Sequence, residues 1–254
     1  MGATDWQGLL GALVRGDDLT EDAAGAALGD IMSGSVPEAR IAAFLVALRA
    51  KGETAEEIAG FVRAMVDHAE SIDVDGVLVD TCGTGGDGAG TFNVSTVAAI
   101  VTAAAGARVA KHGNRAASGR CGSADLLEAW GVVIDLPPAA VARTIEELGI
   151  GFLFARSFHP AMRHVGRVRS ELGIPTVFNV LGPLTNPARV DRQVVGVADP
   201  RLAPLVAGAL LRLERRHALV FRGEDGLDEL TTTGPSRLWE IKDGRVSESL
   251  FDPA

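Results

Sequence analysis

The strongest constraint on the fold is a change of hydrophobic rhythm near residue 72. Up to about Ser71 the apolar residues recur at helical spacing, and no strand signal interrupts them. From Val77 onward, short apolar runs alternate with helical windows, which is typical of a parallel sheet covered by helices. The sequence therefore predicts an α/β protein. A small helical domain, residues 1–72, precedes a larger domain, residues 73–254, whose mainly parallel sheet is flanked by helices.

The first part is predicted to form four short helices. Residues 9–14 place their leucines and valine on one face, and two later segments resemble capping boxes. These are Ser35-x-x-Glu38 and Thr54-x-x-Glu57, and Pro37 suits the first turn of the third helix.

In the second part, each strand is predicted from a short apolar run. The expected strands are 77–80, 107–110, 132–134, 151–154, 194–197 and 218–221, followed by a hairpin of 238–241 and 246–250. Asp243-Gly244 between the last two runs suits a turn with positive φ. The Ala-rich run 94–110 is predicted to contain a buried helix. Ligands are expected at the carboxyl ends of the parallel strands.

Composition argues against several classes of function. Acidic residues outnumber basic ones by 33 to 24, which gives a net charge of -9 and disfavours a general nucleic-acid binder. The two cysteines, Cys82 and Cys121, form no CxxC motif, so neither zinc nor a disulfide framework is expected. No signal peptide pattern opens the chain and no apolar run is long enough to span a bilayer. We therefore expect a reduced, cytoplasmic setting.

A glycine-rich loop, Gly83-Thr84-Gly85-Gly86-Asp87, follows the first predicted strand. Its glycines let the backbone approach a ligand, and a helix beginning near Asn93 adds free amides. A phosphate or diphosphate suits such a site. The segment is neither a P-loop nor the dinucleotide fingerprint, and a generic tight turn stays open on this segment alone.

Two further polar segments lie at matching places. Asn93-x-Ser95-Thr96 opens the next helix, where its side chains either reach the same ligand or form a plain N-cap. Lys111 to Ser118 follows the second strand and supplies Lys111 and Arg115 as cations, unless both are surface residues. Cys121 to Asp125 then begins another helix.

In this order and spacing, these segments resemble the phosphoribosyl-diphosphate-binding segments of the anthranilate phosphoribosyltransferase family, which belongs to the nucleoside phosphorylase/phosphoribosyltransferase class with a helical N-terminal domain. The similarity continues over essentially the whole chain, through the segments 159–162, 168–173, 178–187 and 226–229.

The resemblance implies transfer of a phosphoribosyl group from 5-phosphoribosyl 1-diphosphate to anthranilate, giving N-(5-phosphoribosyl)anthranilate and diphosphate in tryptophan biosynthesis. Two Mg²⁺ ions per site are implied, held by Asp228, Glu229 and Ser95, although an Asp-Glu pair after Gly226 is otherwise a solvated turn. Carried onto matching positions, the donor-binding residues are Gly83, Thr84, Gly86, Asp87, Thr91, Asn93, Ser95, Thr96, Lys111, Gly113 and Ser123.

The acceptor-binding residues implied by the resemblance are His112, Asn114, His159, Arg169, Gly182 and Pro183. The guanidinium of Arg169 suits the anthranilate carboxylate, although an arginine at a helix end is also commonly a surface residue. His159, just before Pro160, also fits the start of a helix. Neither a covalent nucleophile nor a general base is assigned, because loss of diphosphate needs preorganised charge and the arylamine is already neutral.

The chain departs from the family pattern at three places near the motifs. Pro175 stands where a basic residue is usual, Arg222 where a histidine is usual, and Arg156-Ser157-Phe158 where apolar or aromatic residues are expected. Family members also continue well past the hairpin. We therefore expect a fragment, an incompletely recorded sequence or a short natural variant, with apolar surface exposed.

Association and rival functions complete the expectations. The helical unit is expected to carry a homodimer contact, as in the family, because its apolar stripes exceed what four short helices can bury. The alternatives are an inactive truncated relative and a nucleic-acid-binding paralogue of the same fold. A pyrimidine-nucleoside phosphorylase would need Lys-x-Ser in the glycine loop, which this chain lacks.

Overall fold

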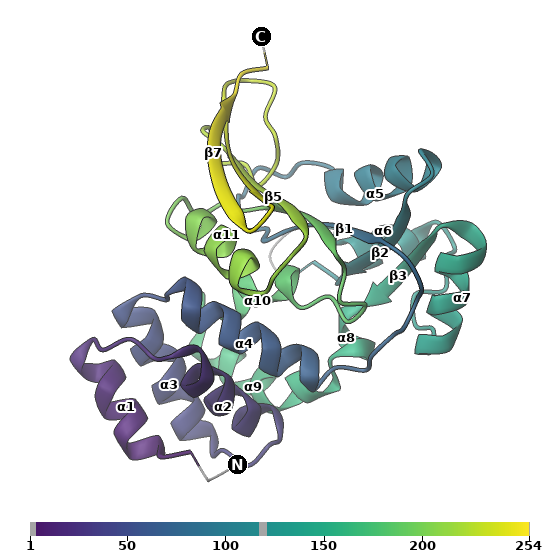
Figure 1. The fold of residues 1–254 in the computed structure, drawn as a ribbon. Helices are drawn as coiled ribbons and strands as arrows, with labels where there is room; N and C mark the ends of the chain where they lie inside the picture. The colour runs from purple at the N-terminus through teal and green to yellow at the C-terminus, as the bar shows by residue number, and fades with distance from the viewer. Residues whose placement is uncertain (1–3, 117–120, 254) are drawn as a thin grey trace.

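The computed structural model describes residues 4–116 and 121–253. Four helices form a bundle at the N-terminal end (Figure 1), as predicted: α1 (Trp6–Arg15), α2 (Glu21–Met32), α3 (Glu38–Lys51) and α4 (Ala55–Asp67). Phe44 lies at the centre of the bundle and makes edge-on contacts with Trp6 and Phe61. The bundle core is therefore built from large side chains that the helical periodicity directs inward.

One of the two predicted capping boxes is present. The hydroxyl of Thr54 accepts from the backbone N–H of Glu57 at 3.1 Å, and Glu57 accepts from the Thr54 N–H at 2.9 Å. The box predicted at Ser35 is wrong. Pro37 occupies the N-cap of α3, so Glu38 is the first helical residue rather than the third, and the Ser35 hydroxyl instead donates to the Asp30 carbonyl.

The second part contains a mainly parallel seven-stranded sheet in the order β3-β2-β1-β4-β5-β6-β7, as predicted. The first five strands in that order are parallel, and β6 and β7 are added antiparallel. Chain order reverses direction between β1 and β4, which is where open α/β sheets bind ligands. The strands are β1 (Leu78–Gly83), β2 (Arg108–Gly113), β3 (Ile150–Phe154), β4 (Arg192–Gly196), β5 (His217–Gly223), β6 (Ser236–Lys242) and β7 (Arg245–Phe251).

The predicted hairpin is confirmed and one predicted strand is wrong. Asp243 and Gly244 both have positive φ, 51° and 71°, in the turn between β6 and β7. The run 132–134 is not a strand: the sheet of the described residues ends at β3, and these residues do not pair with its free edge. Ile134 is instead buried against Phe154 as part of an irregular segment. A short apolar run predicts burial but does not by itself distinguish a strand from a packed loop.

Helices cover both faces of the sheet. α5 (Val94–Ala104) lies over the ends of β1 and β2, and α10 (Phe178–Leu184) and α11 (Leu202–Arg212) lie between the sheet and the bundle (Figure 1). One continuous core joins α10 and α11 to the bundle. The other elements are α6 (Ser123–Ala129), α7 (Pro138–Leu148), α8 (Ala155–Phe158), the 3-10 helix η1 (Pro160–Met162) and α9 (Arg163–Leu172).

The prediction that α5 is a buried helix is wrong. The helix is present, but Val97, Ile100 and Val101 are 40%, 41% and 62% exposed, and only Thr96 and Ala99 are buried. One side of α5 packs on the sheet, and no described element covers the other.

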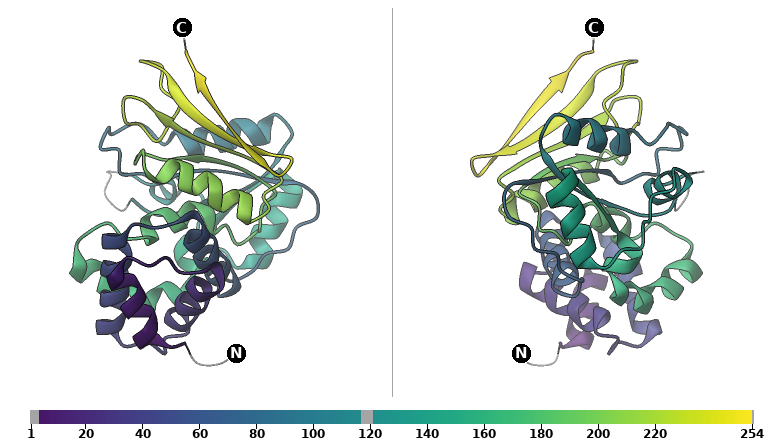
Figure 2. Two further views of the ribbon diagram at one scale, coloured as in Figure 1. Left: turned by 60° about the vertical axis from the view of Figure 1, so that its left-hand side comes forward. Right: turned by 90° about the vertical axis from the view of Figure 1, so that its right-hand side faces the viewer.

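The β6–β7 hairpin projects from the molecule at the end opposite the bundle in both views of Figure 2, and all of β7 is exposed.

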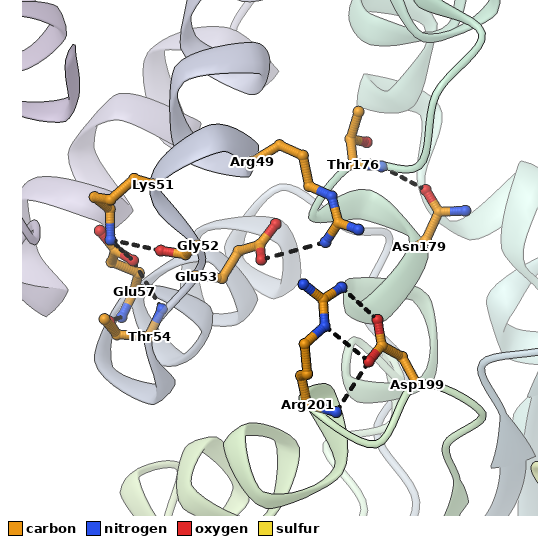
Figure 3. Close-up of polar contacts among 10 residues, drawn as sticks. All are labelled: Arg49, Lys51, Gly52, Glu53, Thr54, Glu57, Thr176, Asn179, Asp199 and Arg201. Atoms are coloured by element: carbon orange, nitrogen blue, oxygen red, sulfur yellow. Dashed lines mark hydrogen bonds and ion pairs between the residues drawn. The ribbon is translucent and has the colours of Figure 1, made fainter. Parts of the chain in front are cut away.

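Charged side chains face one another where the bundle meets the α/β part (Figure 3). On the bundle side, Arg49 pairs with Glu53 at 3.8 Å. On the other side, Arg201 pairs with Asp199 at 2.7 Å, just after β4. The Arg201 guanidinium and then Arg49 help hold the pKa of Asp199 below its usual range. The junction is thus polar at this edge and apolar between α4 and α11.

Candidate active site

The glycine loop leaves β1 at the point where chain order reverses and is held against the end of β4. The Thr84 N–H donates to the Gly196 carbonyl at 2.9 Å, and the Ala198 N–H donates to the Thr84 hydroxyl at 3.3 Å. Gly85 and Gly86 have φ of 66° and 84°, a region that side chains with a Cβ rarely adopt. The glycines are therefore required by the backbone path of the loop.

Asp228 lies directly on this loop although it is 143 residues away in sequence. Its Oδ2 accepts from the Gly85 N–H at 2.7 Å. The approach depends on two glycines, because a Cβ on Gly83 would collide with the Asp228 carboxylate and a Cβ on Gly196 with the Asp228 carbonyl. Gly196 was not predicted as a site residue; a glycine inside an apolar strand was the available signal.

Three carboxylates gather where Asp228 meets the loop. Burial, and then the charges of Asp228 and Asp87, raise the pKa of Glu229 to about 7, while Lys111 acts in the opposite direction. Burial also raises the pKa of Asp228, and Asp87 adds to that effect. Oδ2 of Asp87 is buried without a hydrogen-bond partner in the described structure. The cluster therefore favours a cation.

These residues fit Mg²⁺ shared with a phosphate ligand. Among the described residues, no group of three or more His, Cys, Asp or Glu side chains is arranged to hold a metal ion by itself. Mg²⁺ is commonly bound by one or two carboxylates together with substrate phosphates and water. Asp228 and Glu229, next to the glycine loop, match that arrangement.

The start of α5 joins the ends of β1 and β2. The Lys111 ammonium donates to the Thr81 carbonyl at 2.7 Å and to the Ser95 hydroxyl at 3.3 Å. The Thr96 hydroxyl donates to the Ser123 hydroxyl at 3.1 Å. Ser95, Thr96, Lys111 and Ser123 are therefore brought together beside the glycine loop, where the N-terminus of α5 adds its dipole.

Asn93 and Gly113 support the same region. Asn93 occupies the N-cap position of α5, but its side chain makes no capping hydrogen bond; its amide donates to the Cys121 carbonyl at 3.0 Å. A Cβ on Gly113 would press on the Phe152 ring and on Ser123. Both residues thus help join β2 to the start of α6.

Other donor-side residues are less closely engaged. Thr91 is exposed in the loop before α5. The Arg115 guanidinium, expected as a cation for the ligand, is paired with Asp125 at 2.9 Å and Glu128 at 2.8 Å. Ser118 lies outside the described residues. Lys111 is therefore the cation that the structure places beside the loop.

The acceptor-side residues gather around α10. The rings of His112 and His159 lie 5.2 Å apart, and Nε2 of each is buried without a hydrogen-bond partner in the described structure. Burial, and then the neighbouring His159, lower the pKa of His112 to about 3, against a smaller opposing effect of the Gly182 carbonyl. Burial lowers the pKa of His159 to about 4, opposed by the Thr185 carbonyl. Both rings are therefore neutral at pH 7.

Arg169 is placed differently from a surface arginine. Its guanidinium lies over the Phe178 ring, 5.2 Å from the centroid, and burial lowers its pKa. No carboxylate pairs with it among the described residues, whereas Arg167 on the same helix pairs with Glu171 at 2.8 Å. Arg169 is thus a half-buried cation without a protein counter-ion. Asn114, by contrast, is exposed and accepts from the Arg115 N–H at 2.8 Å.

Arg222, which departs from the family pattern, supports the glycine loop through Ala198. Its Nε donates to the Ala198 carbonyl at 2.8 Å, and the N–H of Ala198 holds Thr84. The substitution thus has a structural role at the rim of the site.

Comparison with known proteins agrees with this geometry. Residues 7–69 match the helical bundle domain of a glycosyl transferase family, and residues 75–254 match the a/b domain of a glycosyl transferase family. The protein is therefore a glycosyltransferase built from these two domains. Within that class, the chain belongs to the anthranilate phosphoribosyltransferase family, as the resemblance predicted.

The relatives are close over the whole chain. The anthranilate phosphoribosyltransferase of Arthrobacter sp. (strain FB24) is 59% identical over 98% of this chain and 70% of its own length. The crystal structure of the enzyme from Thermus thermophilus matches with a TM-score of 0.90 at 50% identity, covering 96% of this chain and 73% of that one. The Saccharomyces cerevisiae enzyme in complex with PRPP and Mg matches with a TM-score of 0.88 at 32% identity, covering 98% of this chain and 73% of that one.

No helix among the described residues is long and apolar enough to cross a membrane.

Proposed function

We propose that the chain transfers the phosphoribosyl group of 5-phosphoribosyl 1-diphosphate to the amino group of anthranilate, with Mg²⁺, in tryptophan biosynthesis. The observation that supports this proposal is the contact of Asp228 with Gly85, because a carboxylate beside the amides of a glycine loop suits a metal-bound diphosphate. Two relatives that are 59% and 56% identical to this chain are named for this activity.

The diphosphate binds along the glycine loop and the start of α5. Backbone amides of the loop, the hydroxyls of Ser95, Thr96 and Ser123, and the Lys111 ammonium provide donors and positive charge for its oxygens. Asp228 accepts a hydrogen bond from the Gly85 N–H, so the carboxylate lies next to the amides of this loop. Asn93, Gly113 and Thr91 complete the donor side.

Mg²⁺, when bound, neutralises charge on the leaving diphosphate. Asp228 and Glu229 would hold one ion, and Ser95 would contribute to a second. Burial, and then repulsion from Asp228, raise the pKa of Glu229, and a bound cation would favour its charged form. The two ions are part of the proposal, as is the assignment of Ser95.

Anthranilate binds beside α10, next to the neutral pair His112 and His159. The half-buried Arg169 guanidinium pairs with its carboxylate, because a planar cation without a protein counter-ion suits a planar anion. Gly182, Pro183 and Asn114 complete the acceptor side.

Catalysis rests on positioning and preorganised charge. As the diphosphate departs, positive charge gathers on the ribose ring, and the arylamine attacks the anomeric carbon as a neutral nucleophile. The C–N bond forms, the C–O bond to diphosphate breaks, and the amine loses one proton. No covalent intermediate with the protein is involved.

The assay follows the loss of anthranilate fluorescence when the purified chain is mixed with 5-phosphoribosyl 1-diphosphate and Mg²⁺. We expect the loss to require all three additions and to yield one diphosphate per anthranilate consumed. Unchanged fluorescence at high protein concentration, with the protein folded by circular dichroism, would contradict the proposal.

The bundle carries a homodimer contact, and the protein works in the cytoplasm. Val14 is 79% exposed on α1 and Val46 is 42% exposed on α3, which leaves apolar side chains on two helices of the bundle. The molar mass by light scattering tests the dimer. A monomeric mass at assay concentration would contradict the proposed homodimer.

A further inference from the structure

Three polar side chains are buried beneath the acceptor side of the site. Asp80 of β1, Gln193 of β4 and Asn186 after α10 are 0%, 1% and 0% exposed. Asp80 and Gln193 are direct partners in neighbouring strands, so their side chains share one face of the sheet, the face that α10 covers. Burial of polar groups is costly unless they are hydrogen-bonded, so their contacts decide what they do.

Gln193 connects β4 to α10 by a hydrogen bond. Its Nε2 donates to the Pro183 carbonyl and to Oδ2 of Asp80, the latter at 3.4 Å. The carbonyls in the last turn of a helix have no partner within that helix, and the Gln193 amide supplies one. The Pro183 carbonyl and the Asp80 carboxylate are both hydrogen-bond acceptors, so the Gln193 amide must present its NH₂ group to them.

The connection continues to β2. Oδ1 of Asp80 accepts from the backbone N–H of His112 at 3.1 Å, and the Asn186 amide donates to the Ala110 carbonyl at 2.7 Å. Pro183 is therefore linked through Gln193 and Asp80 to the backbone of His112. Two residues of the proposed acceptor site are joined by two buried side chains.

The Gln193 amide lowers the stability of the folded protein through its second polar atom. Its Oε1 is buried with no hydrogen-bond partner in the described part of the chain. An unsatisfied buried acceptor is destabilising, and an apolar side chain of the same shape would avoid it. Polar groups that cost stability are expected at functional sites.

From these contacts we infer that Gln193 is a positioning residue for the acceptor: it sets the distance between Pro183 and His112 and so shapes the place where anthranilate binds. This inference rests on the proposed function. The donor residues Ser95 and Lys111 meet on the opposite face of the sheet, and neither forms a hydrogen bond with Gln193 in the described structure. Loss of the amide therefore affects the acceptor more than the donor.

The test is Gln193→Met, which keeps the length of the side chain and removes the donor. We expect the KM for anthranilate to rise about tenfold, since one hydrogen bond to a buried carbonyl is lost. The KM for 5-phosphoribosyl 1-diphosphate changes less than twofold. Equal changes in both KM values, or none in either, would overturn the inference.

Val141→Ala is the matched control for general destabilisation. Val141 is buried in α7 and packs in a separate core cluster with Ile145 and Leu153, away from α10. Its loss lowers the melting temperature without changing the ratio of the two KM values. A shift of the ratio in this variant equal to that in Gln193→Met would mean that the effect is only one of stability.

Cys82→Val answers the same question if Gln193→Met does not fold. The Cys82 thiol donates to the same Pro183 carbonyl at 3.5 Å, and valine has a similar volume without the donor. We expect a change in the same direction and smaller, because a thiol is a weak donor; an unchanged ratio then counts against the inference. An inactive but folded wild-type chain would refute the proposed function itself.

Discussion

Lys111 and His112 are neighbours on β2 whose side chains reach opposite faces of the sheet. The Lys111 ammonium meets Ser95 at the start of α5, and the His112 ring meets His159 beneath α10. Successive residues of a strand alternate between faces, so one strand supplies both sides of the site. Donor and acceptor would then meet at the carboxyl end of β2, which can be reached from both faces of the sheet.

The carboxylate pair gives the first prediction. Asp228→Asn with Glu229→Gln should lower kcat/KM about 100-fold and raise the Mg²⁺ concentration needed for half-maximal rate, because charge on the departing diphosphate is no longer balanced. Burial raises the pKa of both carboxyls, so neutral amides leave the fold at least as stable. Mg²⁺ titrations of the rate measure the effect. Glu224→Gln, exposed in the same segment, is the control, and equal Mg²⁺ dependence in both proteins would contradict the assignment.

Arg169 gives the second prediction. Arg169→Ala should raise the KM for anthranilate about tenfold or more and leave that for 5-phosphoribosyl 1-diphosphate nearly unchanged, since a charge-assisted pair with the carboxylate is lost. Initial rates with each substrate varied in turn measure both constants. Arg167→Ala removes an exposed arginine from the same helix and should change neither constant. An equal rise in both constants would remove the carboxylate role from Arg169.

Arg222 gives the third prediction, on the donor side. Arg222→Ala frees the carbonyl of Ala198, whose N–H holds Thr84, so the glycine loop loses a support. We expect the KM for 5-phosphoribosyl 1-diphosphate to rise about fivefold, with that for anthranilate unchanged. Arg237→Ala, at an exposed arginine of β6, is the control. If the KM for 5-phosphoribosyl 1-diphosphate equals that of the control, the glycine loop does not depend on the hydrogen bond from Arg222 to the Ala198 carbonyl.

Buried histidines give the fourth prediction. The pKa of His112 is held at about 3 in the folded protein, below its ordinary value of about 6.5, so the unfolded chain binds more protons between those values. Stability is therefore fully present above about pH 6.5 and falls as pH drops toward 3, by at most about 1.4 kcal/mol per pH unit for this group.

The corresponding measurement is urea unfolding between pH 4 and 8 for the wild type and His112→Gln. The variant should lose stability less steeply below pH 6.5, although His159 keeps part of the slope. Comparison at pH 7.5 corrects for the loss of packing. Parallel lines for the two proteins would contradict the prediction, because they would show that the pKa of His112 is the same in the folded and the unfolded chain.

Much of the fold could be predicted because the signals are local. The four helices, the parallel strands, the Asp243-Gly244 turn and the Thr54 capping box all follow from periodicity or from residues a few positions apart. The glycine loop was predicted for the same reason, since glycines after a strand need no distant partner to indicate an anion site.

The failed expectations concern what surrounds an element. The run 132–134 has the apolar composition of a strand, but it does not pair with the sheet, and Ile134 packs against the Phe154 side chain instead. The sequence of α5 is apolar on every side, yet the helix packs on the sheet by only one side. Composition shows that a segment favours burial, whereas the neighbours decide whether it is buried.

By itself, the sequence determined the class of fold, the order of the ligand-binding segments and their family. Only the tertiary structure placed Asp228 on Gly85, across 143 residues, and Gln193 between Asp80 and Pro183. The physical reason is that helix and strand periodicity comes from the backbone of each segment, while the contacts of a site depend on strand order and helix packing across the whole chain.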